Sequence, residues 1–202
     1  KNNEIFDEKV SETKTEENAS DNVSEEKAEE KKKKSKKVQK EKPKVKKETP
    51  GLQLLIRDMF ETMFKANGVG LSAVQIAIPL RIFVIEAHIE KENFHFRGVF
   101  INPKILREFG DLTKHPEGCL SVPGIAALVE RPSSIEMEWY DENWEYHKET
   151  FDGFAARIIQ HEYDHLEGEI YVDKLDKMWR DMIDPTLELI EDRAIEIPYL
   201  IR

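Results

Sequence analysis

The first part of the folded region is marked by apolar residues that recur at the spacing of a helix and then of strands. In LQLLIRDMFETMF, residues 52–64, the apolar positions fit a helix that ends before the glycines of NGVG. The stretch GVGLSAVQ (68–75) is expected to form a loop. RIFVIEA (81–87) and VFINPKIL (99–106) are rich in β-branched and aromatic residues, so both are predicted to be strands.

The middle of the chain alternates apolar and polar residues around a turn signal. ALVERP (127–132) and SSIEMEWYDENWEYHKETF (133–151) predict antiparallel strands that turn at DEN. We expect ERP to mark an edge or a boundary of the sheet, because proline cannot donate to a strand ladder.

The last part of the chain returns to a helical pattern. FAARIIQHEYDHLEG (154–168) is the clearest helix, with Gly168 placed as its stop. YVDKL (171–175) is expected to be a short strand or a turn. Pro185 should kink or end a helix within residues 176–195. Together these elements predict an α+β fold in which antiparallel strands pack around the central helix 154–168.

The first fifty residues differ in composition from the rest of the chain. Residues 1–50 contain almost no large apolar side chains, so we predict a disordered, charged tail. Acidic residues dominate 1–30, whereas 31–47 form a block of lysines that fits a solvated linker or a salt-sensitive contact with RNA phosphates. We expect the folded catalytic domain at 51–180 and a C-terminal helix and extension at 181–202.

Charge and cysteine content narrow the possible partners and compartments. The net charge of −10 resides in the folded part, which is therefore a poor binder of nucleic acid, and we expect no specific DNA target. No apolar run approaches the length of about 18 residues that spans a membrane. Cys119 is the single cysteine, which excludes an internal disulfide. With an acidic amino terminus that does not look like a targeting signal, these features predict a cytoplasmic protein.

The motif QHEYDH (160–165) is the strongest candidate for chemistry. His161 and His165 are four residues apart, and Glu162 directly follows the first histidine. On a helix, residues four apart lie on one face with Cβ atoms about 5–6 Å apart, so both imidazoles could bind one ion. Glu162 would then lie beside that ion, where a general base can act on water. Without a metal, the pattern describes an amphipathic helix with ordinary histidines.

A third metal ligand has several candidates. A metzincin pattern requires histidine where this chain has Tyr171, and a thermolysin-like pattern requires a downstream glutamate such as Glu188 or Glu191. Upstream, EGCLS contains Cys119. A thiolate, two imidazoles and one open position make a tetrahedral site that suits Fe(II) or Zn(II), although a lone cysteine is also often a small buried apolar residue.

Three motifs together point to one family. GVGLSAVQ, EGCLS and QHEYDH, in this order and at these separations, resemble the signature motifs of peptide deformylases. The similarity covers roughly residues 52–180, without the strand that usually precedes the first helix in this family. The resemblance implies a metal-dependent hydrolase that removes the formyl group from the N-terminal formylmethionine of nascent polypeptides and releases formate. It implies N-formylmethionyl peptides as partners, and a ribosome that the Lys-rich tail could contact.

The resemblance also implies roles for the site residues. Cys119, His161 and His165 would bind one divalent metal ion, with Fe(II) expected and Zn(II), Ni(II) or Co(II) as alternatives. Glu162 would act first as general base and then as general acid. The side chain of Gln75 and the backbone N–H of Leu120 would donate hydrogen bonds to the formyl oxygen in the transition state.

Further residues are implied to shape and support the site. By motif position, Val69, Gly70, Phe154 and Ile158 would border the pocket for the methionine side chain. Gly70, which has no side chain, would let the loop backbone pair with the peptide as an added strand. Glu117 and Arg131 match a pair that braces the cysteine loop in relatives.

Two other functions fit parts of the sequence. A zinc endopeptidase would use Glu188 or Glu191 as its third ligand and would keep its metal without Cys119. A non-catalytic ribosome- or RNA-binding relic would depend on the lysine block and would release no formate.

Overall fold

The computed structural model describes residues 44–89 and 93–194, which belong to one compact unit beginning at Lys42. The predicted disordered tail lies outside the described residues up to residue 43. Among the described helices, none is long and apolar enough to cross a membrane. The elements in chain order are α2 (Leu52–Lys65), β1 (Gly70–Ser72), the 3-10 turn η1 (Ala73–Ile76), β2 (Ile82–Ile89), β3 (Phe94–Cys119), β4 (Val122–Tyr140), β5 (Tyr146–Asp152), α3 (Gly153–Glu167), η3 (Tyr171–Lys174) and α4 (Lys177–Glu191).

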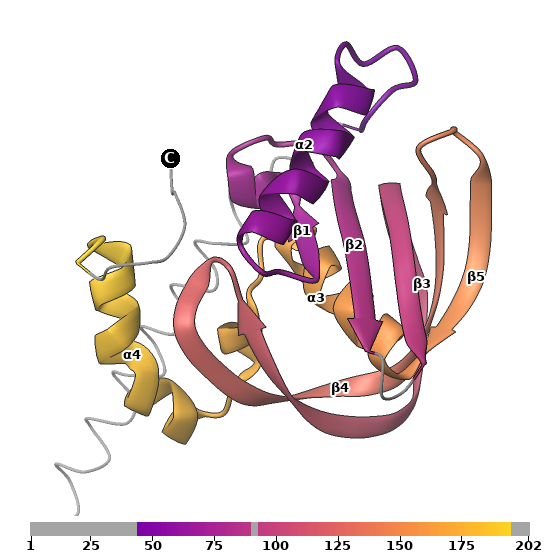
Figure 1. Cartoon of the computed structure of the whole chain (residues 1–202). Coiled ribbons are helices and arrows are strands. Elements are labelled where there is room, and N and C mark those ends of the chain that lie inside the picture. Colours follow the sequence, from indigo (N-terminus) through magenta and orange to yellow (C-terminus); the bar gives the residue numbers. More distant parts are fainter. Residues whose placement is uncertain (1–43, 90–92, 195–202) are drawn as a thin grey trace, which may run out of the picture. The chain divides into compact units, whose positions relative to one another are not determined.

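The strands form one antiparallel sheet in the order β1-β2-β3-β4-β5, so each strand pairs with its neighbour in the chain (Figure 1). The antiparallel pairing of β4 and β5 around residues 141–145 confirms the turn predicted at DEN. Together with its helices, this sheet confirms the predicted α+β class.

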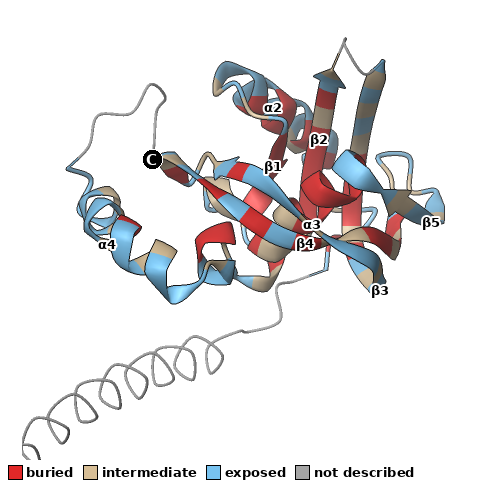
Figure 2. Cartoon of the chain, turned by 90° about the horizontal axis from the view of Figure 1, so that it is seen from below, coloured by how far each residue is buried: buried red, intermediate tan, exposed pale blue. Residues whose placement is uncertain are grey.

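The sheet is covered on both faces, which explains why β2 is apolar at nearly every position. Ile82 and Val84 point to the side of α2, whereas Phe83, Ile85 and Ala87 point to the side of α3. Successive strand residues face opposite sides of a sheet, so a strand buried on both sides has no polar face. In Figure 2 much of the α3 ribbon has the colour of buried residues. Helix α3 is therefore held at the centre of the fold.

The long strands β3 and β4 bend away from the sheet as a two-stranded arm (Figure 1). Their pairing shifts register at four points, including Phe109/Leu112 and Gly118/Cys119, and such bulges bend and twist a strand pair. The segment ERP does not interrupt β4; Pro132 lies just before Ser134, where pairing with β5 begins. The arm carries Cys119 from the sheet to the side of α3.

YVDKL forms the 3-10 turn η3, which confirms the second of the two forms expected for it. Two other local expectations were wrong or incomplete. GVGLSAVQ is not simply a loop, because its residues Gly70–Ser72 pair with β2 and Ala73–Ile76 form a 3-10 turn. Pro185 does not end its helix, since α4 continues through it to Glu191. Ile183 of α4 is buried in a cluster with η3 and the arm, and this packing outweighs the local cost of the proline.

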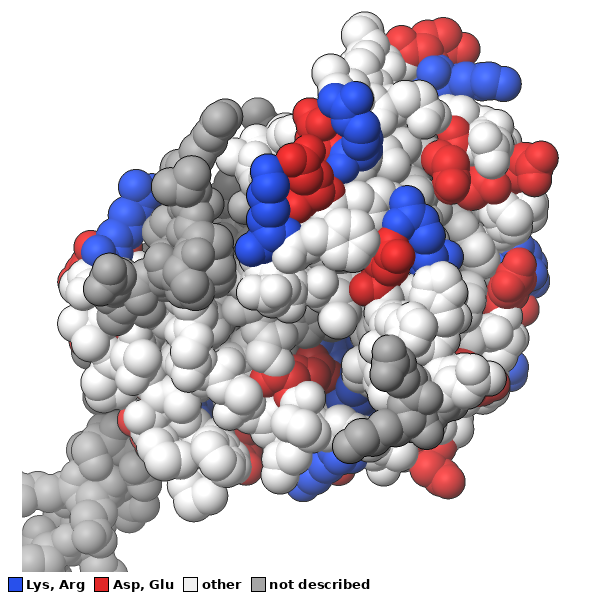
Figure 3. Space-filling model, in the orientation of Figure 1, with Lys and Arg blue, Asp and Glu red and all other residues white. Residues whose placement is uncertain are grey.

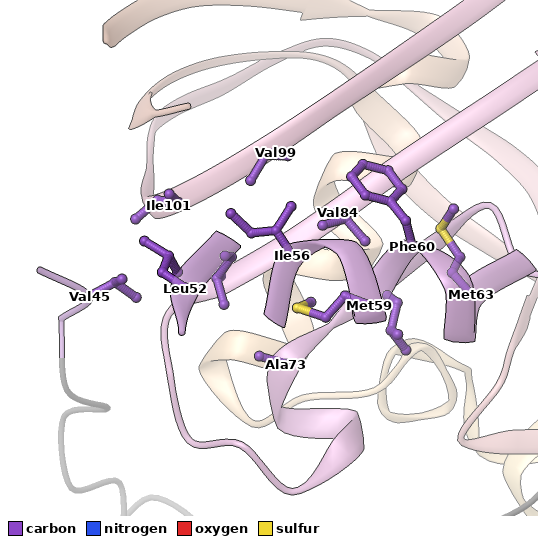
Figure 4. Close-up of a cluster of buried hydrophobic side chains, with 12 residues drawn as sticks. Val45, Leu52, Ile56, Met59, Phe60, Met63, Ala73, Val84, Val99 and Ile101 are labelled. Atoms are coloured by element: carbon purple, nitrogen blue, oxygen red, sulfur yellow. The ribbon is translucent and has the colours of Figure 1, made fainter. Parts of the chain in front are cut away.

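The described start of the unit, residues 44–50, contacts the core although the sequence predicted a tail there. Val45 is 3% exposed and lies beside Leu52 and Ile101 (Figure 4). Its backbone N–H donates to Asn102 Oδ1 at 2.8 Å, and Asn102 Nδ2 donates to the Val45 carbonyl at 2.9 Å. An isolated apolar residue among lysines gives too weak a pattern to predict this contact.

Candidate metal centre

Helix α3 places His161 and His165 side by side near its C-terminal end. The helix ends at Gly168, whose left-handed conformation (φ 81°) lets the Glu169 N–H donate to the Asp164 carbonyl at 2.9 Å. The two imidazole ring centroids are 5.1 Å apart, one helical turn along the same face. The predicted helix and its stop are confirmed, and the pair faces the tip of the β3–β4 arm.

Cys119 meets the histidine pair from β3. Its Sγ lies 3.2 Å from His165 Nε2, and ligand atoms of Cys119, His161 and His165 all lie within 4.8 Å of one another. The Ser121 N–H and the Gln75 side-chain amide approach the sulfur at 3.4 and 3.6 Å. One sulfur and two ring nitrogens that converge in this way fit a borderline divalent cation such as Fe(II) or Zn(II).

The downstream glutamates do not take part in this convergence. Glu188 and Glu191 are exposed on α4, and neither belongs to the group of possible metal ligands formed by Cys119, His161 and His165. Among the described residues, the other group with metal-ligand spacing is Asp141, Glu145 and His147 at the turn between β4 and β5. There Asp141 Oδ1 already accepts the backbone N–H groups of residues 143 and 145, which is its role in the turn.

Glu117, two residues before Cys119, fixes the orientation of His161. Its Oε2 lies 2.9 Å from His161 Nδ1, and Arg131 donates to both carboxylate oxygens at 2.7 and 2.9 Å. Burial alone would raise the pKa of Glu117, but the hydrogen bonds from Arg131 and His161 outweigh it and hold the pKa well below its usual range. A carboxylate that stays ionised accepts the Nδ1 proton of His161 and leaves Nε2 available for a cation.

Glu162 directly follows His161 and is buried, and its side chain contacts a different set of groups. Its Oε2 accepts a hydrogen bond from Ser72 Oγ at 2.9 Å, and its carboxyl group lies against Gly70. Burial raises the pKa of Glu162 to about 7, an effect that His161 and the Ser72 hydrogen bond partly oppose. A carboxyl group with a pKa near neutral is well suited to accept and return a proton.

The remaining predicted residues line one pocket of about 560 Å³ beside these groups, and the pocket also contains Cys119, His161 and Glu162. Gln75 is held in the pocket lining, because its Oε1 accepts the Ser72 N–H at 2.8 Å and its Nε2 donates to Ser121 Oγ at 3.1 Å. Gly70 and Ile158 are buried in the wall, whereas Val69 and Phe154 are 45% and 41% exposed at the rim. Leu120 lines the pocket directly after the cysteine.

The structure therefore brings together all ten residues predicted for the site: Glu162, Gln75, Leu120, Cys119, His161, His165, Val69, Gly70, Phe154 and Ile158.

Several supporting residues were not predicted from the sequence. Ser72 holds Glu162, Tyr171 stacks on His161 with ring centroids 6.0 Å apart, and Arg157 donates to Glu117 at 2.7 Å. Arg157 offered one signal, because a basic residue four positions before His161 must share the buried face of the helix. Ser72 and Tyr171 offered none, since their contacts depend on how distant segments pack.

Gly70→Ala is expected to disturb the site because of the contact with Glu162. A Cβ at residue 70 would lie 2.3 Å from Glu162 Oε1, so the carboxyl group or β1 must move. We expect a loss of about 1–3 kcal/mol in the free energy of unfolding, together with slower turnover. Chemical denaturation measures the first effect. Gly118→Ala is the stability control, because its Cβ would meet no atom closer than 3.6 Å; an equal loss in both variants would contradict the steric explanation.

Comparison with known proteins agrees with this arrangement. A family model described as polypeptide deformylase matches residues 23–181, and thus begins earlier than the region of similarity expected from the motifs. A peptide deformylase of Christiangramia forsetii is 42% identical over 170 residues, which cover 78% of this chain and 86% of that protein. The crystal structure of a peptide deformylase from Synechococcus elongatus in complex with actinonin has a TM-score of 0.66 and 38% identity over 74% of this chain and 82% of that one. A Met-Ala-Ser-bound class I type b peptide deformylase from Acinetobacter baumannii has a TM-score of 0.62 and 31% identity over 67% of this chain and 89% of that one.

Proposed function

This chain belongs to the peptide deformylase family, and we propose that Cys119, His161 and His165 bind the metal ion of a deformylase active site. The family's reaction is the metal-dependent hydrolysis of the formyl group from N-terminal formylmethionine, which releases formate. The observation that carries our assignment is the convergence of one thiol and two imidazoles beside a buried glutamate in a single pocket.

The donor set fits one divalent ion, for which we propose Fe(II), with Zn(II), Ni(II) or Co(II) as substitutes. When bound, such an ion polarises the formyl carbonyl and lowers the pKa of water to about 7. The protein contributes the orientation of the ligands: Glu117 holds the Nδ1 side of His161, and two N–H donors approach the Cys119 sulfur. Metal analysis of protein purified without oxygen would test the identity of the ion.

Glu162 moves the protons of the reaction. A water molecule attacks the formyl carbon, and the Glu162 carboxylate accepts the proton that the water loses. The C–N bond of the tetrahedral intermediate then breaks, and Glu162 returns a proton to the departing methionine nitrogen, so that formate and a free amine result. Ser72 keeps the carboxyl group in place through both steps, because its hydroxyl oxygen lies 2.9 Å from Oε2 and 2.7 Å from the Glu162 carbonyl, and its one proton is shared between these two acceptors.

Negative charge develops on the formyl oxygen during the attack, and two hydrogen-bond donors would stabilise it. We assign this role to the Gln75 side-chain amide and to the backbone N–H of Leu120, which follows Cys119. Loss of one such donor typically costs about 3 kcal/mol of transition-state stabilisation. The bond from Ser72 N–H to Gln75 Oε1 fixes which end of the amide points into the pocket.

The peptide binds beside β1 with its methionine side chain in the apolar part of the pocket. Among the described strands β1 is the edge strand of the sheet, and its residue Gly70 pairs with Ile85 of β2. An extended peptide can therefore add to the opposite side of β1. Ile158 and Phe154 supply apolar surface for the methionine side chain. The Met-Ala-Ser complex of the Acinetobacter relative supports N-formylmethionyl peptides as the substrate class.

Release of formate from an N-formylmethionyl tripeptide is the direct test of this function. We expect anaerobically purified, iron-loaded protein to produce formate and a free amino terminus in equal amounts, and chelated protein to produce neither. The unformylated peptide is the control. Cleavage of an internal peptide bond without formate would instead support the endopeptidase alternative, which the exposed positions of Glu188 and Glu191 do not favour.

We also propose that the protein works in the cytoplasm and contacts the ribosome through its Lys-rich block 31–47. On the face seen in Figure 3, acidic and basic side chains are interspersed rather than gathered into one basic patch. The lysine block, which lies largely outside the described residues, is therefore the better candidate. Co-sedimentation with ribosomes should weaken as salt rises and should be lost when residues 31–47 are removed.

A further inference from the structure

The carboxylate of Glu117 accepts hydrogen bonds from four donors. Oε1 accepts from Arg131 Nε and from Arg157 Nη1, each at 2.7 Å. Oε2 accepts from Arg131 Nη2 at 2.9 Å and lies 2.9 Å from His161 Nδ1. A carboxylate has about four lone-pair positions, so Glu117 is saturated and cannot rotate without breaking a bond to a buried cation.

Two of these donors come from the same face of α3. Arg157 precedes His161 by one helical turn, and His165 follows by another turn. On β3, Glu117 and Cys119 are two residues apart, and both side chains contact α3, through His161 and His165 respectively. A four-residue step along a helix is about 6.0 Å and a two-residue step along a strand is about 6.6 Å. The two repeats match, so His161 reaches Glu117 while His165 reaches Cys119, and the long side chain of Arg157 reaches Glu117 from one turn earlier on the helix.

Arg157 also donates hydrogen bonds to the backbone of the arm formed by β3 and β4. Its side chain donates to the carbonyl of Val129 on β4 at 3.0 Å and to the carbonyl of Thr113 on β3 at 2.7 Å. Arg157 is 5% exposed. Buried backbone carbonyls and a buried carboxylate lose much of their stabilisation when such a donor is removed.

We propose that Arg157 is a positioning residue that sets the register of α3 against β3 and thereby holds His161, His165 and Cys119 at the spacing that a metal ion requires. This inference rests on the proposed function, since it concerns the same three ligands. Without Arg157, Glu117 would keep Arg131 but lose its second bond to α3. The imidazole of His161 would then lose a fixed partner, and the helix could shift along the arm.

Cobalt binding tests this proposal without relying on turnover. The full chain, Arg157→Met and Arg157→Lys would be titrated anaerobically with Co(II) in competition with a chelator, and the visible spectrum of the saturated protein recorded. We expect Arg157→Met to bind Co(II) about 10- to 100-fold more weakly, with altered absorption bands, because the ligands are no longer held in one geometry. Arg157→Lys keeps the charge but not the planar set of donors, so its affinity for Co(II) should lie between those of the full chain and Arg157→Met.

Arg81 supplies the matched control. It also anchors α3, through Glu167 at 2.8 Å and the Pro103 carbonyl at 3.1 Å, but it does not contact Glu117. Arg81→Met and Arg81→Lys should bind Co(II) like the unmodified chain. If Arg157→Met does not fold, the Co(II) affinities of Arg157→Lys and Arg81→Lys are compared instead. Weaker binding in Arg157→Lys alone would support the proposal.

The outcomes separate this inference from the proposed function. Unchanged Co(II) affinity and spectrum in the folded Arg157 variants would overturn the positioning role while leaving the ligand set intact. Equal losses in the Arg157 and Arg81 variants would also overturn it, because any loosening of α3 would then suffice. A parent chain that binds no Co(II) would instead contradict the assignment of the metal ligands themselves.

Discussion

In Glu162→Gln, we expect formate release to fall by about 10²- to 10⁴-fold, the usual contribution of a general base. Glutamine has the same shape and can still accept the hydrogen bond from Ser72, but it cannot take a proton. The metal content should remain that of the parent chain, because Glu162 is not among the three converging ligands. Steady-state formate release and metal analysis on the same sample measure both quantities.

The matched control for this prediction is Glu167→Gln, which removes a carboxylate from the end of the same helix. Glu167 pairs with Arg81 and does not line the pocket, so turnover should stay close to that of the parent chain. Full activity in Glu162→Gln would show that another group accepts the proton.

Cys119→Ala should abolish both tight metal binding and turnover. The substitution removes one of three ligands, a larger change than the loss of a supporting hydrogen bond, which alone costs about 10- to 100-fold in metal affinity. The buried pocket has room for the smaller side chain, so the fold should persist. Metal analysis after dialysis should find less than one ion per chain, and circular dichroism should be unchanged.

Glu188→Gln is the reciprocal control for the cysteine variant. If the third ligand were the downstream glutamate of an endopeptidase, Glu188→Gln or its Glu191 counterpart would lose the ion and Cys119→Ala would keep it. We expect the reverse, since Glu188 is exposed on α4 while the Cys119 sulfur lies 3.2 Å from His165 Nε2.

Much of the fold could be predicted from the sequence, and the ten candidate site residues lie together in or beside one pocket. The two helices with clear apolar periodicity have nearly the predicted bounds, because each buries one face against the same sheet. Candidates for the metal ligands follow from side chains at particular spacings, whereas Gln75, Leu120 and the pocket residues were predicted from the family resemblance of the three motifs. Their roles in catalysis stay proposals until the variants are measured.

The rest depends on contacts between distant segments. Strand β1 has three residues, which are too few to show an alternating pattern. It is a strand because its backbone pairs with β2. Pro185 lies within a helix because tertiary packing of α4 outweighs the local preference. For Arg157 the sequence indicates only a position on the buried face of α3, and its contact with Glu117 depends on β3 being brought opposite that face.

The matched steps of α3 and β3 restrict how the length of this protein can vary in evolution. Insertion of one residue between Glu117 and Cys119 would turn the sulfur to the opposite face of the strand. Insertion of one residue between Arg157 and His165 would rotate one of them by about 100° around the helix. We therefore expect natural insertions and deletions among relatives to fall in turns such as 141–145 and to leave both of these spacings unchanged.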